Sequence, residues 1–334
     1  MSDPVNVALY GFLSQVWLKN NTTGSEIVVD RVQSFEPTGS FNTQEYRELG
    51  RKGLVGITQD SPEYRVSVEQ NLTNSLELDW VLAGKPVSPA GVQSYTMGDI
   101  LTYAGQLSAY LLKRNQDNTI LNEHLISGCS VSELAFRFSV NSAITQMVSL
   151  IGTSGRLYKS ASTIHSWGTL DDSSLGGIHG KDARLWLTSG STAAGRSFRL
   201  QNMNLRVSFP SVFVREIGRR SLVGTLSDSP TVTLDFDILL ADDQPTEKLF
   251  TDVTTYYDLD QPATAFNAFI RVFDPTGTEG TNIVKSFKVD NVMPVSHTPV
   301  RSQVRGLSTA RYSLISSREA VADNGGLTVS NSNQ

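Results

Sequence analysis

Hydrophobic and polar residues alternate along several stretches of this chain. In "EYRVSVEQ" (63–70), "SELAFRFSVN" (132–141) and "TVTLDFDILL" (231–240), every second residue is apolar. A period of two over this length is typical of a half-buried antiparallel strand. The pattern predicts strands at all three places.

Other segments extend the same picture. Residues 15–37 and 184–210 each read as a Trp-bearing strand, a turn rich in Gly, Ser and Thr, and a second strand, which is typical of a hairpin. Short helices are predicted at 73–85 and 244–258, the second weakened by its β-branched residues. The first half then closes with strands at 132–141, 145–152 and 154–160. The second half closes with strands in the same order, at 265–273, 283–295 and 308–316.

One segment occurs twice. "YRELGRKGLVGITQDSP" (46–62) matches "VREIGRRSLVGTLSDSP" (214–230) without a gap, at an offset of 168 residues. Ordinary composition gives about one chance identity in such a window. We therefore interpret the chain as an internal repeat. Upstream, aligning Pro37 with Pro210 gives the first copy the longer loop before the matched segment.

The repeat predicts four regions. The first domain spans residues 1–160, a linker rich in Ser and Gly spans 161–182, and the second domain spans 183–320. Residues 321–334 read as a flexible tail. The chain has 334 residues, a length that independently suits about two domains.

Composition narrows the function. Charged residues make up 18% of the chain and the net charge is −5, which argues against a protein that grips nucleic acid by its phosphates. An acidic wall would instead suit nucleic acid that slides past without binding. The single cysteine, Cys129, allows no disulfide within the chain and no thiolate metal site. Neither a signal peptide nor a membrane-spanning stretch is predicted.

Catalytic chemistry is not indicated. None of the four histidines stands three or four residues from another, and no G-x-S-x-G motif occurs. The histidines are expected at the surface or in turns. The acid pairs in "TLDDSS" and "LADDQP" lack the alternation of a calcium loop. We expect no enzymatic activity, cofactor or metal.

The repeated segment therefore points to shape and assembly. Its glycines permit turns with positive φ, and its charges and flanking strands describe a long projecting hairpin or loop. Because a plain solvated loop should have diverged fastest, its retention favours an interface in which its arginines pair with acids of a neighbouring subunit. The expected interface residues are Arg47, Glu48, Gly50, Arg51, Lys52, Gly56, Arg215, Glu216, Gly218, Arg219, Arg220 and Gly224. The repeat turns are Asp60, Ser61, Pro62, Asp228, Ser229 and Pro230.

With its "REIGRRSLVGTLSDSPTVTLDFDIL" type of segment, this order of elements resembles the tail tube proteins of tailed bacteriophages. The resemblance covers about 15–160 and 183–318. It implies a mainly β fold of two tandem tail-tube-like β-sandwich or barrel domains, each with a short flanking α-helix. In that family, rings of six domains stack into a tube that DNA crosses during ejection. A duplicated chain then implies a homotrimeric, pseudo-hexameric ring in which the repeated loop contacts the next ring.

The resemblance also implies partners and a location. The chain would bind itself and other tail proteins (tip, terminator and tape measure), while DNA passes through without specific binding and no membrane is involved. It would be made in the cytoplasm of a host bacterium and reside in the virion tail. Asp235 and Asp237, opposite the apolar stripe of their strand, are candidates for the lumen wall.

Two other functions remain open at this point. A tandem β-sandwich could be a carbohydrate-binding or tail-tip module, which exposed aromatic residues on loops would support. A hydrolase on a β scaffold would require a histidine-centred site.

Overall fold

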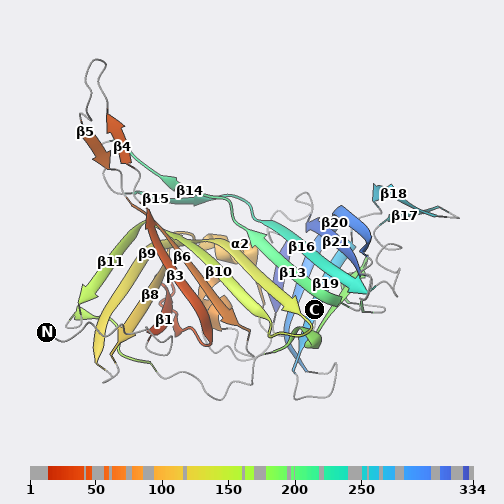
Figure 1. The fold of residues 1–334 in the computed structure, drawn as a ribbon, viewed down its shortest axis with the longest axis horizontal. Coiled ribbons are helices and arrows are strands. Elements are labelled where there is room, and N and C mark those ends of the chain that lie inside the picture. The colour runs from red at the N-terminus through yellow and green to blue at the C-terminus, as the bar shows by residue number, and fades with distance from the viewer. Residues whose placement is uncertain are drawn as a thin grey trace.

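The computed structural model describes the greater part of the chain. The described residues are 14–40, 43–46, 56–59, 62–72, 77–85, 94–115, 119–159, 162–168, 178–193, 197–198, 200–217, 222–239, 250–253, 256–262, 266–274, 282–301, 309–316 and 326–330. Among them the fold is mainly β, as expected, and the strands run antiparallel (Figure 1).

The first half is a sandwich of two sheets that share one long strand. One sheet, here called the outer sheet, runs β2–β1–β8–β9–β11, and the other, the inner sheet, runs β9–β10–β6–β3. The strands are β1 (Ser14–Asn20), β2 (Glu26–Val28), β3 (Val32–Ser40), β6 (Glu63–Asn71), β8 (Leu107–Arg114), β9 (Ile120–Ser139), β10 (Thr145–Gly152) and β11 (Ser154–Lys159). Strand β9 belongs to both sheets because its first part pairs with β8 and β11 and its second part with β10.

The second half repeats this arrangement. Its outer sheet runs β12–β19–β20–β22 and its inner sheet β20–β21–β16–β13. The strands are β12 (Ala183–Thr188), β13 (Leu200–Ser208), β16 (Thr231–Leu239), β19 (Phe266–Phe273), β20 (Ile283–Arg301), β21 (Thr309–Ser316) and β22 (Leu327–Ser330). The long strand β20 is the counterpart of β9, because it also belongs to both sheets of its half. The counterparts of β19, β20 and β21 are therefore β8, β9 and β10. The order along the sequence had matched each of them with the next strand of the first half, that is, with β9, β10 and β11.

The repeat extends to irregularities of pairing. The β3–β6 register slips between Val32 and Ser34, and the β13–β16 register slips 168 residues later, between Leu200 and Asn202. Beyond each slip, partners also match at this offset. The offset therefore holds without a gap from β3 to the matched segment. The alignment of Pro37 with Pro210 was wrong, and the first copy has no longer loop.

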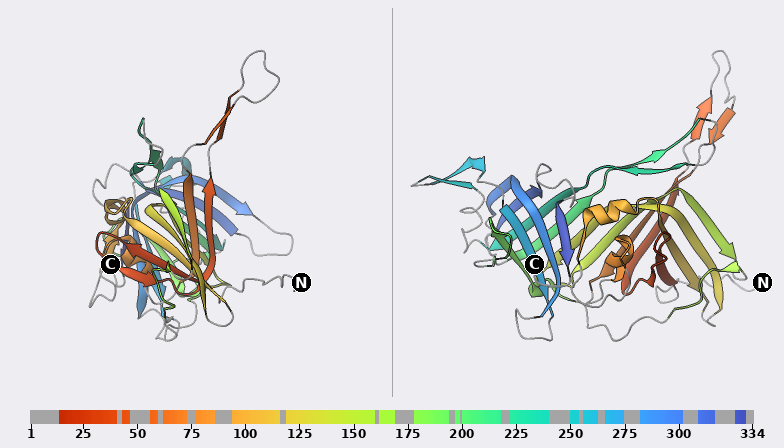
Figure 2. Two further views of the ribbon diagram at one scale, coloured as in Figure 1. Left: turned by 90° about the vertical axis from the view of Figure 1, so that its left-hand side faces the viewer. Right: turned by 180° about the vertical axis from the view of Figure 1, so that it is seen from behind.

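Each half carries a projecting hairpin with one shared register. In the first half β4 (Thr43–Tyr46) pairs with β5 (Gly56–Gln59), and in the second β14 (Ser211–Val214) pairs with β15 (Gly224–Ser227). Every pair in one hairpin has its counterpart 168 residues away in the other, such as Tyr46 with Gly56 and Val214 with Gly224. The repeated segment is thus the hairpin predicted from its glycines. The first-half hairpin extends away from the body (Figure 2).

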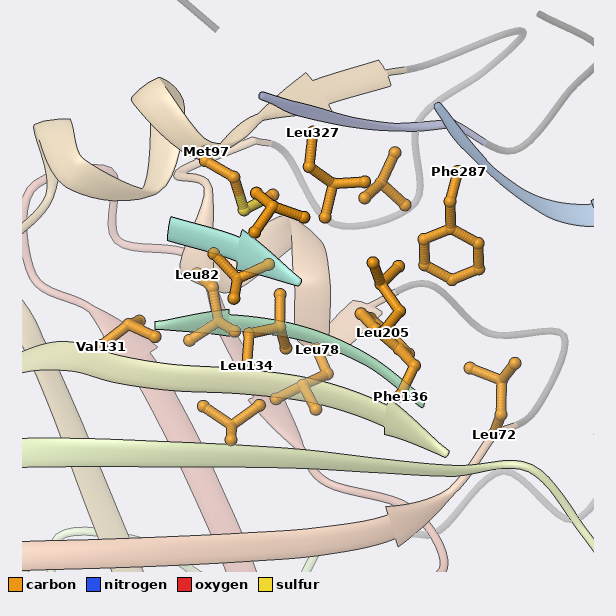
Figure 3. Close-up of a cluster of buried hydrophobic side chains, with 14 of the residues drawn as sticks. Leu72, Leu78, Leu82, Met97, Val131, Leu134, Phe136, Leu205, Phe287 and Leu327 are labelled. Atoms are coloured by element: carbon orange, nitrogen blue, oxygen red, sulfur yellow. The ribbon is translucent and has the colours of Figure 1, made fainter. Parts of the chain in front are cut away.

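The two halves share one hydrophobic core. Phe136 of β9 and Phe287 of β20 meet edge to face with ring centroids 4.7 Å apart. Leucines and valines of both halves surround them, together with Leu327 of the last strand (Figure 3). The apolar faces of the predicted alternating strands are buried, so those interpretations are confirmed.

Helices are confined to the first half among the described residues. Helix α1 (Glu77–Leu82) lies inside the predicted range 73–85. Helix α2 (Met97–Thr102) was not predicted, although Thr96 and Asp99 form the capping box at its start. The helix predicted at 244–258 is wrong, because β17 (Phe250–Val253) and β18 (Tyr256–Pro262) form a hairpin there. The β-branched and aromatic residues of this stretch prefer strands.

The described parts of the expected linker and tail, residues 162–168, 178–182 and 326–330, have defined structure. In the linker, Ile178 is buried in the core and residues Gly180–Asp182 form a 3₁₀ turn. In the tail, β22 pairs with β20 on one side and with β7 (Ser94–Thr96) of the first half on the other. Leu327 and Val329 are buried. The tail therefore ties the two halves together.

Candidate assembly interface

The inner sheets of the two halves join into one. Strand β13 pairs antiparallel with the second part of β9, from Asn202 opposite Ser139 to Ser208 opposite Glu133. The continuous inner sheet therefore has the order β3–β6–β10–β9–β13–β16–β21–β20. This pairing, here called the internal junction, is a contact between two copies of the same domain.

The second-half hairpin crosses the internal junction. Figure 1 shows β14 and β15 extending from the second half over one end of the first. Thr225 and Ser130 form a hydroxyl–hydroxyl hydrogen bond, and the Phe209 N–H donates to the Ser132 carbonyl at 2.9 Å. Just beyond the end of β14, on the side of the hairpin tip, Arg215 pairs with Glu63 at 3.0 Å. An arginine of the repeated segment therefore does pair with an acid of a neighbouring domain, here within one chain.

A buried ion pair completes the internal junction. Asp79 of α1 accepts from Lys285 of β20, and both side chains are almost inaccessible, at 1% and 0% exposed. Gln146 also donates to Asp79. Burial lowers the pKa of Lys285, while the Asp79 charge opposes that shift. An unpaired charge at this depth would be costly, so the pair fixes how α1 meets the second half.

The inner sheet ends in two edges that lack a partner strand among the described residues. At one end β3 pairs only with β6. At the other, residues 293–301 of β20 pair only with β21. These edges are the counterparts of β13 and of the second part of β9, the two strands that meet at the internal junction. Edges of this kind are templates for pairing with another chain.

Acids and arginines alternate across the polar face of the inner sheet, which is the face opposite the core. Among the described side chains, the registers place six acids and four arginines there: Glu36, Glu63, Glu69, Glu133, Asp235, Asp237, Arg65, Arg137, Arg206 and Arg311. Arg206 meets Glu133 at 2.8 Å, and longer pairs join Arg137 to Glu69 at 3.8 Å and Arg311 to Asp237 at 3.9 Å. The face is nearly neutral, unlike the acidic wall that the net charge suggested.

A shallow hollow of about 450 Å³ lies on this face where the two halves meet. Arg137, Asn202, Asn204, Asp235 and Asp237 contribute to its lining. The aromatic rings of Phe136, Phe138 and Phe236 on these strands are buried in the core and do not face the hollow. The hollow reads as the seam between the repeated domains.

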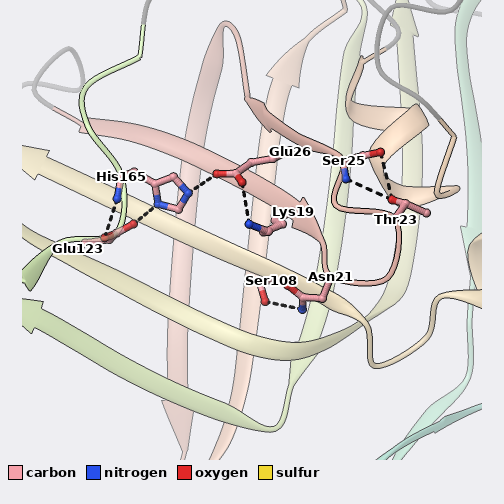
Figure 4. A network of polar contacts seen from close by, with 8 residues as sticks. All are labelled: Lys19, Asn21, Thr23, Ser25, Glu26, Ser108, Glu123 and His165. Atoms are coloured by element: carbon pink, nitrogen blue, oxygen red, sulfur yellow. Dashed lines mark hydrogen bonds and ion pairs between the residues drawn. The ribbon is translucent and has the colours of Figure 1, made fainter.

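A polar network on the outer sheet is the feature that the sequence least predicted (Figure 4). His165, from the expected linker, is 9% exposed and lies between the carboxylates of Glu123 and Glu26, and Lys19 binds Glu26 at 2.9 Å. The rings of Trp17 and Tyr110 pack on the imidazole. Burial alone would raise the pKa of Glu26, but hydrogen bonds from Lys19 and His165 outweigh it and lower the pKa.

This network corrects, for His165, the expectation that the histidines lie at the surface or in turns, whereas His179 is exposed as expected. Both imidazole nitrogens have a carboxylate partner, and Glu123 also accepts from the Ile164 N–H at 2.5 Å. The network thus attaches residues 162–168 to the first half. Only the folded structure brings these groups together, because Glu26 and His165 lie far apart in sequence.

The predicted interface residues fall into three groups. Arg215, Glu216 and Gly224 lie on or beside the second-half hairpin, and Gly56 begins β5. Asp235 and Asp237 lie on the polar face of the inner sheet, opposite the core. Outside the described residues lie Arg47, Glu48, Gly50, Arg51, Lys52, Gly218, Arg219 and Arg220.

The repeat turns are described in part. In the second copy Asp228 and Ser229 are exposed and Pro230 is buried. The Ser229 N–H donates to the Asp228 carboxylate, and the Asp228 N–H donates to the Pro210 carbonyl at 2.8 Å, so the turn closes the hairpin base. In the first copy Pro62 is described, while Asp60 and Ser61 lie outside the described residues.

Two searches of the described residues give no candidate. No helix there has the length and apolar character needed to cross a membrane. No cluster of three or more His, Cys, Asp or Glu side chains there has a geometry that could hold a metal ion.

Comparison with known proteins gives a slight structural likeness. No family model matches the sequence, and no curated protein matches it. Among solved structures, the chain is similar to one from the sheath–tube complex of an extracellular contractile injection system in its extended state (TM-score 0.31, 10% identity, 41% of this chain and 84% of that one). It is also similar to one from the tube-terminating cap of the anti-feeding prophage (0.33, 12%, 52% and 98%) and one from its sixfold-symmetrised baseplate (0.33, 13%, 48% and 99%).

Proposed function

We propose that this chain is a structural protein of a phage tail, and that three copies close into a ring whose stacking builds the tail tube. The main support is the internal junction. One chain already joins two copies of the domain edge to edge through β9 and β13, and its two unpaired edges are the counterparts of those strands. A head-to-tail contact of this kind closes into a ring when the rotation is right.

The internal junction predicts a register for the contact between chains. Asn204 lies opposite Arg137 within the chain. The counterpart of Asn204 is Glu36, at the offset of 168. The counterpart of Arg137 is Arg301, because Thr145 pairs with Arg137 as Thr309 pairs with Arg301. We therefore expect Glu36 of one copy to lie opposite Arg301 of the next, with opposite charges on the polar face.

Ring closure would produce a wide channel. Each chain contributes eight strands to the inner sheet. Three copies would give about 24 strands, more than the 16–18 that already leave an aqueous channel in closed barrels. The apolar face of the inner sheet is buried, so its polar face would line the lumen, with Asp235 and Asp237 among the lining residues.

The charge of that face suits passage without binding. A protein that grips DNA needs a basic surface that releases counterions. Here arginines are interleaved with acids, and three cross-strand pairs neutralise them. We infer that DNA crosses such a lumen without specific contacts. The outward side of the second-half hairpin, where Val212 and Leu226 are each 63% exposed, is our candidate surface for stacking on the next ring.

The first test is negative-stain electron microscopy of the purified chain. End-on views should show threefold rings of near-sixfold outline around a hole. Glu36→Arg alone should reduce the ring fraction, and Glu36→Arg with Arg301→Glu should restore it, because the charge pair is only exchanged. Bilobed monomers at all concentrations, with a tail-tip complex added as nucleus, would refute the proposal.

The retained arginines give a second test. Reversing the charge of both Arg51 and Arg219 should stop tube growth, because the retained segment is proposed to contact neighbouring subunits. Circular dichroism should be unchanged. Tubes of normal length from the double variant would contradict the proposed role.

A further inference from the structure

Two apolar side chains of the second half stand exposed where the first half has buried or half-buried serines. Met293 is 38% exposed and Val295 is 63% exposed. Strand register identifies their counterparts. Ser130 pairs with Ile151 as Met293 pairs with Ile315, so Met293 matches Ser130.

A shared bulge confirms the match. In β9 the register with β10 skips Ser132, between Val131 and Glu133. In β20 the register with β21 skips Val295, between Pro294 and Ser296. Val295 therefore occupies the bulge position of Ser132.

The second-half hairpin covers Ser130 of the first half, while Ser132 is half-buried and its hydroxyl donates to the Ser149 carbonyl at 3.0 Å. Ser130 is 0% exposed, and its hydroxyl meets Thr225 of β15 and accepts from the Gly105 N–H at 2.7 Å. The Phe209 N–H, just before the hairpin, donates to the Ser132 carbonyl. This crossing is made within one chain and uses mainly hydroxyl and backbone groups.

The first-half hairpin carries the matching change. Ile57 of β5 pairs with Glu45 of β4. Thr225 of β15 pairs with Phe213 of β14 in the equivalent register, so Ile57 is the counterpart of Thr225. Isoleucine therefore stands where the internal crossing has threonine. Three counterpart positions change together from hydroxyl-bearing to apolar residues: Thr225 to Ile57, Ser130 to Met293 and Ser132 to Val295.

We propose that the hairpin of β4 and β5 docks on the second half of the next copy and covers Met293 and Val295 with Ile57. The occupant is thus a second copy of this chain, and the inference rests on the ring proposed above. A contact between separate chains has no covalent tether, so apolar burial is the suitable source of its free energy.

The chemical difference also determines which hairpin fits which docking site. A hairpin bearing Thr225 suits the hydroxyl-bearing site of the first half, and one bearing Ile57 suits the apolar site of the second. First and second halves then alternate around the ring. Wrong pairings would leave hydroxyl groups against apolar side chains without partners.

Disulfide trapping in the full-length protein tests the contact. Ile57→Cys with Met293→Cys should give covalent dimers and trimers on oxidation of assembled rings, seen on a non-reducing gel. Thr225→Cys with Ser130→Cys is the matched control and should close within one chain at monomer mass. Ile57→Cys with Leu157→Cys should give no bond between copies, because Leu157 lies on β11 of the outer sheet, 67% exposed.

A second set of variants needs no new cysteine. Replacing Ile57 by Thr and both Met293 and Val295 by Ser converts the external crossing to the internal chemistry. The dissociation constant of the ring should rise at least about tenfold, as expected for three lost apolar contacts. Val212→Ser with Leu226→Ser, which changes two exposed residues on the other side of the second hairpin, should leave single rings intact.

The outcomes separate the two proposals. Rings by microscopy without inter-copy cross-links from the Ile57–Met293 pair would overturn the docking and leave ring formation standing. A protein that forms no rings, with or without a tail-tip complex, would refute the proposed function and the docking with it. Cross-links of equal yield from the Leu157 control would also overturn the docking.

Discussion

Replacing Asp79 by Asn should destabilise the whole chain, because it leaves the buried Lys285 without its counter-charge. Lys285 is 0% exposed, and its Nζ lies 4.8 Å from the centre of the Phe136 ring. Removing one partner of such a pair costs about 3–5 kcal/mol. With a urea m-value of about 3 kcal/mol/M, the unfolding midpoint should fall by about 1 M or more.

The pH dependence of this loss is also fixed in sign. Burial already lowers the pKa of Lys285, and only Asp79 opposes that shift. In the variant the pKa should fall further, so the unfolded state binds more protons than the folded state. Raising the pH towards the ordinary lysine pKa then disfavours unfolding, and the difference from the parent protein should shrink.

The assay is urea unfolding at pH 7 and at pH 9, followed by both tryptophan fluorescence and circular dichroism. The two probes should report one transition because the halves share one core. As the matched control, Asp79→Leu with Lys285→Met should lose less stability than Asp79→Asn, because it leaves no unpaired buried charge, although the Gln146 amide loses its acceptor. A loss below about 1 kcal/mol for Asp79→Asn, or an equal loss at both pH values, would refute the reasoning.

Two further predictions concern other buried groups. Burial raises the pKa of Cys129 to about 12, so alkylation of the folded protein should be very slow at pH 8.5, and rapid labelling without denaturant would contradict this. The free energy of unfolding should also fall as the pH rises from about 9 towards 12, and this fall should be larger in the parent protein than in Cys129→Ser. Gly84 has a φ of +63°, and a Cβ there would lie 2.1 Å from a tyrosine ring. Gly84→Ala should therefore lower the melting temperature clearly more than the control Gly24→Ala, where φ is +74° and the space is open. Equal shifts in melting temperature would show that the tyrosine ring moves aside at little cost.

The sequence determined the class of fold and its duplication. Alternation at 63–70, 132–141 and 231–240 predicts half-buried strands because the two faces of a strand have different surroundings, and all three bury their apolar face. The matched segment predicts a repeated hairpin, and both copies form it with the same register. These features depend on local spacing, which a sequence states directly.

Local spacing was insufficient where distant segments decide the outcome. Residues 244–258 have helical spacing only in part, and strand-favouring side chains prevail. Residues Leu327–Ser330 of the expected tail form a strand because β20 and β7 provide edges on both sides of it, and the sequence of the tail alone does not indicate these partners. His165 is buried because Glu26 and Glu123 converge on it from other strands.

The candidate interface was likewise predicted in part from the sequence and completed only by the tertiary structure. The sequence singled out the repeated segment and its arginines as an interface, from their retention alone. Only the tertiary structure shows that Arg215 meets Glu63 across two domains, and that β9 and β13 join the two inner sheets. Pairing partners far apart in sequence are chosen by the complementarity of whole sheet edges and buried faces, which exists only once the chain has folded.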